Sequence, residues 1–447
     1  MSCVPFVHVP DSPHYWLTNG RIPKALLAST DQLTALPQFL DDQQEELVAA
    51  DIEIRDGRIS AIVTAGEAPD SGLRCDLGQG LVWPCFVDMH THLDKAHAWP
   101  RTPNPLGTFA EALKQANRDR QAYWRPADLK RRMDFALGCS YAHGTRAVRT
   151  HLDCLEDQAE TSFAVIDELR SQWAGKIDIQ FVSLVPIEFF LEDRAPALAQ
   201  LLAKYGGILG AVTYAHPQLE AQVERLFQLA SDYDLAVDLH VDESLDPEDQ
   251  ALGAIAQIKL RQGFENSVVC GHVCSLSVQS ESIVKTTLEQ IKAADISIVS
   301  LPMCNLYLQD RHPGRMPRYR GVTLLHELQH QGIPVALASD NCRDAFYAYG
   351  DHDGLEVFTQ SVRIGHLDRP YGSWPQAVTV TPAQIMGLAE SGRLGVGASA
   401  DLVLFKARSL NELISRTQGD RAVLRQGQGI NTTPPDYAEL DDLMGWA

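Results

Sequence analysis

The feature that most constrains the fold is a series of short apolar segments that alternate with helical stretches through the middle of the chain. Each segment precedes a stretch able to form a helix, and residues 221–231 are an amphipathic example. Eight strand–helix repeats over about 300 residues predict an α/β fold, a (β/α)8 TIM barrel rather than a doubly wound sheet. No Gly-rich phosphate loop follows the first segment, which argues against dinucleotide binding. The predicted strands are residues 86–88, 145–151, 179–184, 209–213, 236–240, 267–272, 296–301 and 335–340.

The two ends of the chain have a different character. Residues 50–63 alternate apolar and polar side chains around Asp56-Gly57, the pattern of a β-hairpin with one buried face. Residues 15–23, 400–405 and 422–428 also resemble strands. We therefore expect a small β-sandwich domain built from both termini, residues 1–82 and 390–447, and a catalytic barrel over residues 83–389.

Charge and composition restrict the partners. Aspartate and glutamate outnumber lysine and arginine by 58 to 38, and the net charge is −20. A field of that sign repels phosphate backbones and anionic lipid, so we expect neither nucleic acid nor membrane as a partner. The nine cysteines include no C-x-x-C pair, and the N-terminus lacks signal-peptide features. We expect a cytoplasmic location and, because such barrels often assemble, a homo-oligomer.

Polar side chains occur where the predicted strands end. In a closed barrel these ends converge at one mouth, where the active sites of this fold lie. His90 and His92 point the same way from one strand, as residues i and i+2 do, and two neutral imidazoles suit Zn²⁺ or Fe²⁺. An H-x-H pair alone is weak evidence for a metal site, but further candidate ligands follow later strands. The strand-end residues are His90, His92, His151, His240, His272 and Asp340.

Three of these residues, and Glu243 close to one of them, suggest definite chemistry. His240 would supply a third metal nitrogen, and Glu243, three residues later, fits a proton shuttle. A solvated acidic loop is the alternative for Glu243. His272 could ligate the metal, polarise the substrate or be a core histidine. Asp340 leaves an apolar strand, which suits a metal ligand and general base, with a structural helix cap as the alternative.

These segments resemble the amidohydrolase superfamily, and several are similar to its cytosine deaminase branch. The resemblance covers essentially the whole chain. It is carried by Cys85-Phe-Val-Asp-Met-His-Thr-His-Leu-Asp, Val148-Arg-Thr-His-Leu-Asp, His240-Val-Asp-Glu, Asn305-Leu-Tyr-Leu-Gln-Asp-Arg, the stretch 321–341 and Gly395-Val-Gly-Ala-Ser-Ala-Asp-Leu-Val.

The resemblance implies one divalent metal ion, Zn²⁺ or Fe²⁺, held by His90, His92, His240 and Asp340. It implies Glu243 as the proton shuttle and His272 as the residue that orients or stabilises the nucleophile. Asp340 would also act as base. No carboxylated lysine is expected, because the third strand contains none, and Lys95 is interpreted as structural or at the rim.

The departures from the branch concern the substrate. Cytosine deaminases have a glutamine after the third strand, where this chain has Glu188 as the nearest polar residue. Asn341 replaces a second aspartate, and Phe346 stands where a tryptophan is usual. Glu188 would favour a ring edge that presents N–H donors, as in a guanidine-like group. We expect Glu188, Asn341, Phe346 and His151 to contact the substrate.

The sequence thus predicts a metal-dependent aminohydrolase that deaminates a small heterocycle, a cytosine-like pyrimidine or related ring. The metal would lower the pKa of a bound water, and the products would be the keto ring and ammonia. Pterin, isocytosine, isoguanine or triazine substrates are the alternative, as is removal of an alkylamine. A remote alternative is a barrel that binds a ligand without catalysing a reaction. The other zinc deaminase fold requires H-x-E with P-C-x-x-C, and the chain has no usable form of that pair.

Overall fold

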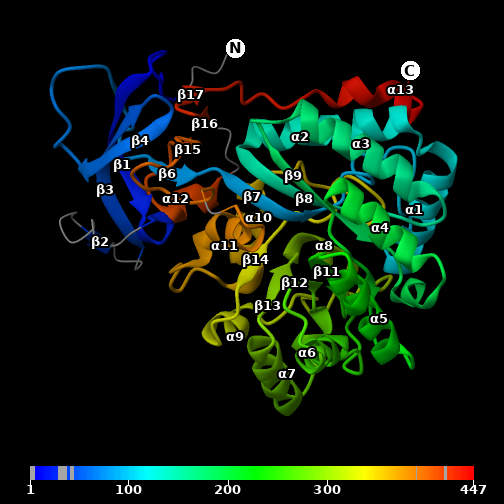
Figure 1. Cartoon of the computed structure of the whole chain (residues 1–447). Coiled ribbons are helices and arrows are strands. Elements are labelled where there is room, and N and C mark those ends of the chain that lie inside the picture. The colour runs from blue at the N-terminus through cyan, green and yellow to red at the C-terminus, as the bar shows by residue number, and fades with distance from the viewer. Residues whose placement is uncertain (1–5, 29–37, 41–44, 389, 417–419, 447) are drawn as a thin grey trace. The chain divides into compact units, whose positions relative to one another are not determined.

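The computed structural model describes residues 6–28, 38–40, 45–388, 390–416 and 420–446 (Figure 1). The chain forms two compact units, and each contains several stretches of sequence. The first contains Met1–Val87, Gly138–Ala147 and Asp353–Pro434, and the second contains Asp88–Leu137, Val148–His352 and Pro435–Ala447. The domain boundaries expected at residues 82 and 390 stay predictions, and residues 1–5, part of the N-terminus used above, lie outside the described residues.

The first unit contains a nine-stranded sheet drawn from both ends of the chain. Its order is β17-β16-β15-β6-β1-β3-β2, with β4 paired to β3 and β5 to β1. Among the described residues these strands form one sheet, so the expected two-sheet sandwich is not confirmed. Its strands are β1 (His14–Pro23), β2 (Gln38–Leu40), β3 (Glu46–Arg55), β4 (Arg58–Thr64), β5 (Arg74–Asp76), β6 (Leu81–Pro84), β15 (Leu402–Phe405), β16 (Arg421–Arg425) and β17 (Gln428–Gly429).

The predicted hairpin is β3 and β4. Arg55 pairs with Arg58 across the turn. Asp56 has φ 49° and Gly57 has φ 78°. Positive φ at both central residues defines a type I′ turn, which matches strand twist and favours Asp-Gly. The Asp-Gly signal in the sequence therefore located this hairpin correctly.

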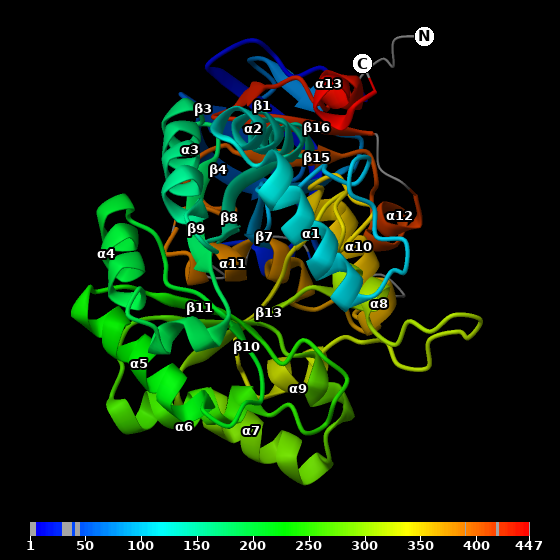
Figure 2. The ribbon, with the colours of Figure 1, turned by 90° about the vertical axis from the view of Figure 1, so that its right-hand side faces the viewer.

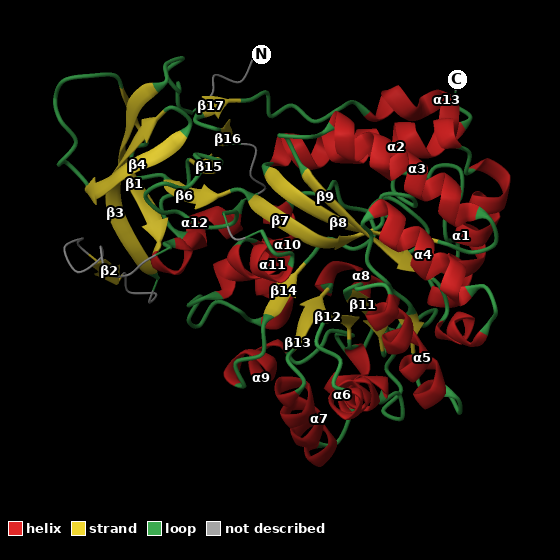
Figure 3. Ribbon diagram, in the orientation of Figure 1, coloured by secondary structure: helices red, strands yellow, loops and turns green. Residues whose placement is uncertain are grey.

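All eight strands predicted for the middle of the chain are present (Figure 3). They form a three-stranded sheet, β7-β8-β9, and a five-stranded parallel sheet, β10 to β14 in chain order. β11 and β12 are buried at every position, as expected for parallel strands covered on both faces. The strands are β7 (Phe86–Thr91), β8 (Thr145–Asp153), β9 (Asp178–Leu184), β10 (Val212–Thr213), β11 (Val237–Val241), β12 (Val268–His272), β13 (Ile296–Ser300) and β14 (Val335–Leu337).

Isolated bridges connect these two sheets at both edges. Val182 pairs with Ile208 and Pro186 with Val212, which joins the end of β9 to the segment of β10. Thr91 pairs with Asp340, which joins the end of β7 to the residues after β14. All three bridges are parallel. The carboxyl end of β7 therefore lies beside the carboxyl end of β14.

Helices follow most of the strands, and α5, α6 and α7 lie along one side of β11–β13 (Figures 1 and 2). None of the described helices is both long and apolar enough to cross a membrane. The α-helices are α1 (Phe109–Tyr123), α2 (Pro126–His143), α3 (Gln158–Gln172), α4 (Ala195–Tyr205), α5 (Leu219–Asp232), α6 (Ala251–Gln262), α7 (Glu281–Ala293), α8 (Pro302–Leu308), α9 (Leu325–His330), α10 (Gly354–Gly365), α11 (Val380–Ile385), α12 (Leu410–Ser415) and α13 (Asp441–Met444).

Candidate active site

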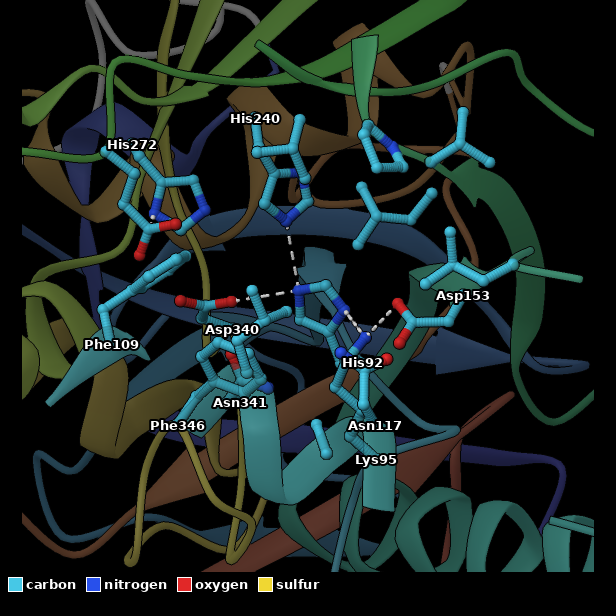
Figure 4. A pocket seen from close by; sticks show the side chains of 18 residues that line it. His92, Lys95, Phe109, Asn117, Asp153, His240, His272, Asp340, Asn341 and Phe346 are labelled. Atoms are coloured by element: carbon cyan, nitrogen blue, oxygen red, sulfur yellow. Dashed lines mark hydrogen bonds and ion pairs between the residues drawn. The ribbon is translucent and has the colours of Figure 1, made fainter. Parts of the chain in front are cut away.

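Four side chains from three strand ends converge in the second unit. The Nε2 atoms of His90 and His92 each lie 3.2 Å from Nε2 of His240. Oδ1 of Asp340 lies 3.3 Å from Nε2 of His92 and 3.7 Å from that of His90. Dashed lines in Figure 4 join His92 to His240 and to Asp340. The structure thus brings together the four predicted metal ligands.

The backbone fixes Asp340 against the first strand of the site. Its N–H donates to the carbonyl of His90 at 2.8 Å, and the hydroxyl of Thr91 donates to the carbonyl of Asp340 at 2.9 Å. Asp340 has φ 63°, in the left-handed region that a non-glycine residue rarely adopts. Such backbone persists only where surrounding contacts determine it, and it is concentrated at functional sites. These contacts hold the carboxylate on the imidazole cluster.

The protonation of the cluster suits a cation. Burial holds the pKa of His90, His92 and His240 well below the ordinary value, which leaves neutral rings with ligand lone pairs. Burial also raises the pKa of Asp340 to about 7. Neither carboxylate oxygen of Asp340 has a hydrogen-bond partner among the described residues. Three neutral nitrogens and an uncompensated buried carboxylate can hold a divalent metal ion.

Glu243 and His272 lie together beside this cluster. Oε1 of Glu243 is 3.3 Å from Nδ1 of His272, and the Asn305 side-chain amide donates to both atoms, at 3.3 and 3.0 Å respectively. The Glu243 side chain is 11% exposed, which contradicts the alternative of a solvated acidic loop. Burial, and then the neighbouring Asp340, raise the pKa of Glu243 well above its ordinary value. Glu243 is therefore a largely buried carboxyl group whose surroundings favour its protonated form.

The loop that carries Glu243 is held by its neighbour Asp242. This residue turns the chain with φ 48°, and its carboxylate accepts from the N–H groups of Ala251 and Leu252 at the start of α6. A carboxylate at a helix N-terminus satisfies backbone donors that have no partner within the helix. Asp242 is thereby committed to the helix cap, and Glu243 is left to line the cavity.

A cavity opens over the cluster (Figure 4). Its space, counted together with the open mouth, is about 670 Å³. Apolar side chains form most of the wall, and the polar ones are concentrated on the side of the cluster. The lining residues are His92, Lys95, Phe109, Leu113, Ala116, Asn117, Asp153, Leu155, Leu184, Val185, Pro186, Val212, His240, Glu243, His272, Asp340, Asn341 and Phe346.

An ion pair at this wall was not predicted from the sequence. The Lys95 ammonium donates to Asp153 at 2.6 Å and lies 3.3 Å from Nδ1 of His92. Lys95 was interpreted as structural or at the rim, and no role was given to Asp153. The signal was available for Asp153, because it follows His151 by two residues on β8, the spacing that links His90 to His92. The second such pair was not read as a site.

Of the four predicted substrate contacts, some line the cavity and others do not. Asn341 and Phe346 line the cavity. His151 lies behind the cluster, fully buried, with its ring 4.0 Å from that of His90 and 4.7 Å from that of His240. Glu188 is not among the described residues that line the cavity, and it accepts a hydrogen bond from the Tyr214 hydroxyl. Two of the four predicted substrate contacts therefore lie at the cavity wall.

Comparison with known proteins identifies the family. The sequence model described as the amidohydrolase family matches residues 192–428. A pterin deaminase from Rhizobium rhizogenes is 47% identical over 441 residues, covering 98% of this chain and 99% of that protein. The chain belongs to the amidohydrolase family. This amidohydrolase is also similar to an N-isopropylammelide isopropyl amidohydrolase from Pseudomonas sp., 24% identical over 79% of this chain and 87% of that protein.

Solved structures agree with this assignment. The 5-methylcytosine deaminase from Klebsiella pneumoniae, liganded with 5-fluorocytosine, superimposes with a TM-score of 0.76 and is 25% identical. The match covers 93% of this chain and 97% of that one. The predicted superfamily and enzyme class, a hydrolase that acts on carbon–nitrogen bonds in cyclic amidines, are confirmed.

Proposed function

We propose that this amidohydrolase is a metal-dependent deaminase of pterin-type rings. The observation that carries the proposal is the 47% identity to a pterin deaminase over nearly the full length of both proteins. The sequence motifs favoured a cytosine-like pyrimidine and kept a pterin as an alternative, and the relatives favour that alternative. Water would replace the ring amine, so that a carbon–nitrogen bond breaks, a carbon–oxygen bond forms and ammonia leaves.

One divalent cation, Zn²⁺ or Fe²⁺, would be held by His90, His92, His240 and Asp340. Neutral imidazole nitrogens with a single carboxylate are a donor set suited to either ion. Bound there, the cation would lower the pKa of a water molecule to about 7 and so supply a nucleophile at neutral pH. The remaining chemistry belongs to side chains of the protein.

Glu243 would manage the proton. Its pKa is raised well above the ordinary value, which favours the protonated carboxyl group, so it can give a proton to the ring nitrogen or the departing amine. As a carboxylate it can then recover a proton from water. His272 and Asn305 would hold the Glu243 carboxyl in place through the contacts at 3.0–3.3 Å described above. Nε2 of His272 has no hydrogen-bond partner among the described residues, which leaves it for the substrate or the nucleophile.

The apolar walls would hold a flat bicyclic ring. Phe109 and Phe346 lie on one side with ring centroids 5.6 Å apart, and Val185 and Val212 also line the cavity. A ring that is rich in nitrogen needs hydrogen-bond partners within such walls, and Asn117 with the Lys95–Asp153 pair would supply them. Glu188 stays a predicted substrate contact; in the structure it accepts a hydrogen bond from Tyr214, which directly follows β10, and neither residue is among the described residues that line the cavity.

The architecture proposed for the site is a closed (β/α)8 barrel. The bridges of Thr91 with Asp340 and of Val182 with Ile208 would complete the ring of β7 to β14. Closure supports the convergence of strand ends on one mouth. Homo-oligomeric assembly and a cytoplasmic location stay predictions from the sequence.

The test is ammonia release from pterin, cytosine, isocytosine and a triazine, by protein loaded separately with Zn²⁺ or Fe²⁺. We expect kcat/KM for pterin to exceed that for cytosine by at least tenfold. An Asp340→Asn variant controls for contaminating activity and should lose turnover with every ring. Equal or better turnover of cytosine would overturn the pterin assignment, while inactivity with all rings would overturn deamination of this class of heterocycle.

A further inference from the structure

A second group of metal-ligating side chains lies in the same unit but outside the cavity. His97, Cys342 and His352 each offer one donor atom, and these three atoms lie within 4.8 Å of one another. None of the three is among the residues that line the cavity. We propose that His97, Cys342 and His352 form a second, structural metal site for Zn²⁺ or another thiophilic divalent cation.

The burial of the group argues for a ligand. His97 and His352 are 2% exposed and Cys342 is 1% exposed. Both ring nitrogens of His97 lack a hydrogen-bond partner among the described residues. A buried imidazole without partners is costly, because folding removes its hydrogen bonds to water and returns none. A cation bound by one of these nitrogens would remove most of that cost.

The protonation and donor set fit a cation. Burial, and then the neighbouring His352, hold the pKa of His97 well below its ordinary value, so its ring is neutral and carries a lone pair. Two imidazole nitrogens and one sulfur match the ligands of zinc sites, which are completed by a fourth group. Asp351 is adjacent in sequence and accepts from the Tyr437 hydroxyl at 2.7 Å. Its carboxylate or a water molecule would take the fourth position.

The charges around the group allow a dication. Asp351 raises the pKa of His97, which means that its carboxylate favours positive charge at this ring. Arg343 and Arg132 lower this pKa. The Arg343 guanidinium lies 4.0 Å from the centre of the Tyr437 ring, where the aromatic face stabilises it, and Arg132 pairs with Asp128 at 2.8 Å. A Cys342 thiolate and the Asp351 carboxylate together carry two negative charges. They would balance a divalent ion.

The position of the group indicates its effect. His97 lies in the segment that follows β7, five residues after His92, whereas Cys342 comes two residues after Asp340. The N–H of His97 donates to the carbonyl of Cys342 at 3.1 Å, so the two segments are already adjacent. Residues 342–352 also include Phe346 of the cavity wall. A metal at this point would clamp together the two segments that carry the active-site ligands, without touching the substrate.

The test is metal stoichiometry and the spectrum of the Co²⁺-loaded enzyme. We expect two metal ions per chain in the wild type and one in both Cys342→Ser and Asp340→Ala, since each variant disrupts a different site. Co²⁺ bound by a thiolate gives an intense charge-transfer absorption. It should be present in the wild type and in Asp340→Ala and absent from Cys342→Ser. Cys75→Ser replaces another buried cysteine and should leave both ions and the absorption unchanged.

One metal ion per chain in the wild type with no thiolate absorption would overturn the proposal. The group of His97, Cys342 and His352 would then hold water or only pack together. Absorption that persists in Cys342→Ser would also overturn it. If Cys342→Ser does not fold, the wild-type spectrum and a His97→Ala variant decide the question. These measurements do not use a substrate, so the second site can fail while the pterin assignment stands, and the reverse is equally possible.

Discussion

Replacing Glu243 with glutamine isolates proton transfer from every other property of the site. Glutamine keeps the length and shape of the side chain, and its carbonyl oxygen can still accept from Asn305, which lies 3.3 Å from Oε1 in the native protein. The backbone carbonyl of residue 243, which accepts from Gln309 at 3.0 Å, is unaffected. What disappears is a carboxyl group whose pKa is raised by burial and by Asp340, and with it the proton that this group can exchange. Any loss of rate therefore measures the contribution of proton transfer by Glu243.

The size of the loss follows from that role. A positioned general acid–base group contributes about 10²–10⁴-fold to the rate. At 1.36 kcal/mol per tenfold, the barrier should rise by about 3–5 kcal/mol. We expect kcat for ammonia release to fall by this factor, while the metal content and the urea unfolding midpoint stay at wild-type values. Both controls are needed, because loss of the metal would lower kcat for a different reason.

Glu248→Gln is the matched control. Glu248 is an exposed residue on the same loop, so its replacement makes the same exchange of a carboxyl group for an amide without touching the cavity. Its kcat should remain within about twofold of the wild type, as for surface substitutions that touch no site. A Glu243→Gln enzyme with kcat within tenfold of the wild type and full metal content would refute the assignment of Glu243 as proton shuttle.

Three further predictions concern other parts of the chain. Arg101 is 5% exposed and forms ion pairs with the buried Asp119 and Asp128. Arg101→Ala should therefore lower the free energy of unfolding by about 3–5 kcal/mol in urea denaturation, while kcat is retained. Asn305→Ala should lower kcat by about 10–100-fold with the metal retained, because His272 loses the donor that orients it; an unchanged kcat would contradict this. The pKa of Glu53 is lowered to about 2 by hydrogen bonds from Ser60 and Arg55, so its carboxylate stabilises the fold above pH 4.5 and this stabilisation disappears as the pH falls towards 2. Glu53→Gln should therefore be less stable than the wild type at pH 7 and equal to it near pH 2, and a gap of constant size would exclude the mechanism.

The sequence predicted the strands of the second unit well because their signal is local. Parallel strands buried on both faces appear as short apolar runs, and all eight runs became strands. Positions at their ends could then be placed relative to one another, since carboxyl ends of neighbouring strands share an edge. His90, His92, His240 and Asp340 meet for this reason. The Asp-Gly turn of β3 and β4 was predictable on equally local grounds.

Side chains in the loops could not be placed in this way. Glu188 lies in a short 3-10 helix, Ile187–Leu191, directly after the bridge of Pro186 with Val212. Its conformation depends on how that segment packs and directs the carboxylate towards Tyr214. His151 follows the strand-end rule, but its ring is fully buried against those of His90 and His240 and is not among the described residues that line the cavity. The position of a residue along its strand does not by itself say how deeply its side chain is buried.

The same distinction explains why the reaction could be predicted more securely than the substrate. The reaction depends on groups fixed by strand ends and backbone bonds, such as Asp340 on the carbonyl of His90. The substrate is selected by polar atoms on the wall, and a site that pairs with a ring N–H strongly rejects rings without it. Asp153, bonded to Lys95, lies at that wall although no role was predicted for it from the sequence, whereas Glu188 is not among the described lining residues. In the proposed function this pair would help to select the ring. Lys95 and Asp153 are separated by 58 positions in sequence, and only the folded chain brings them together.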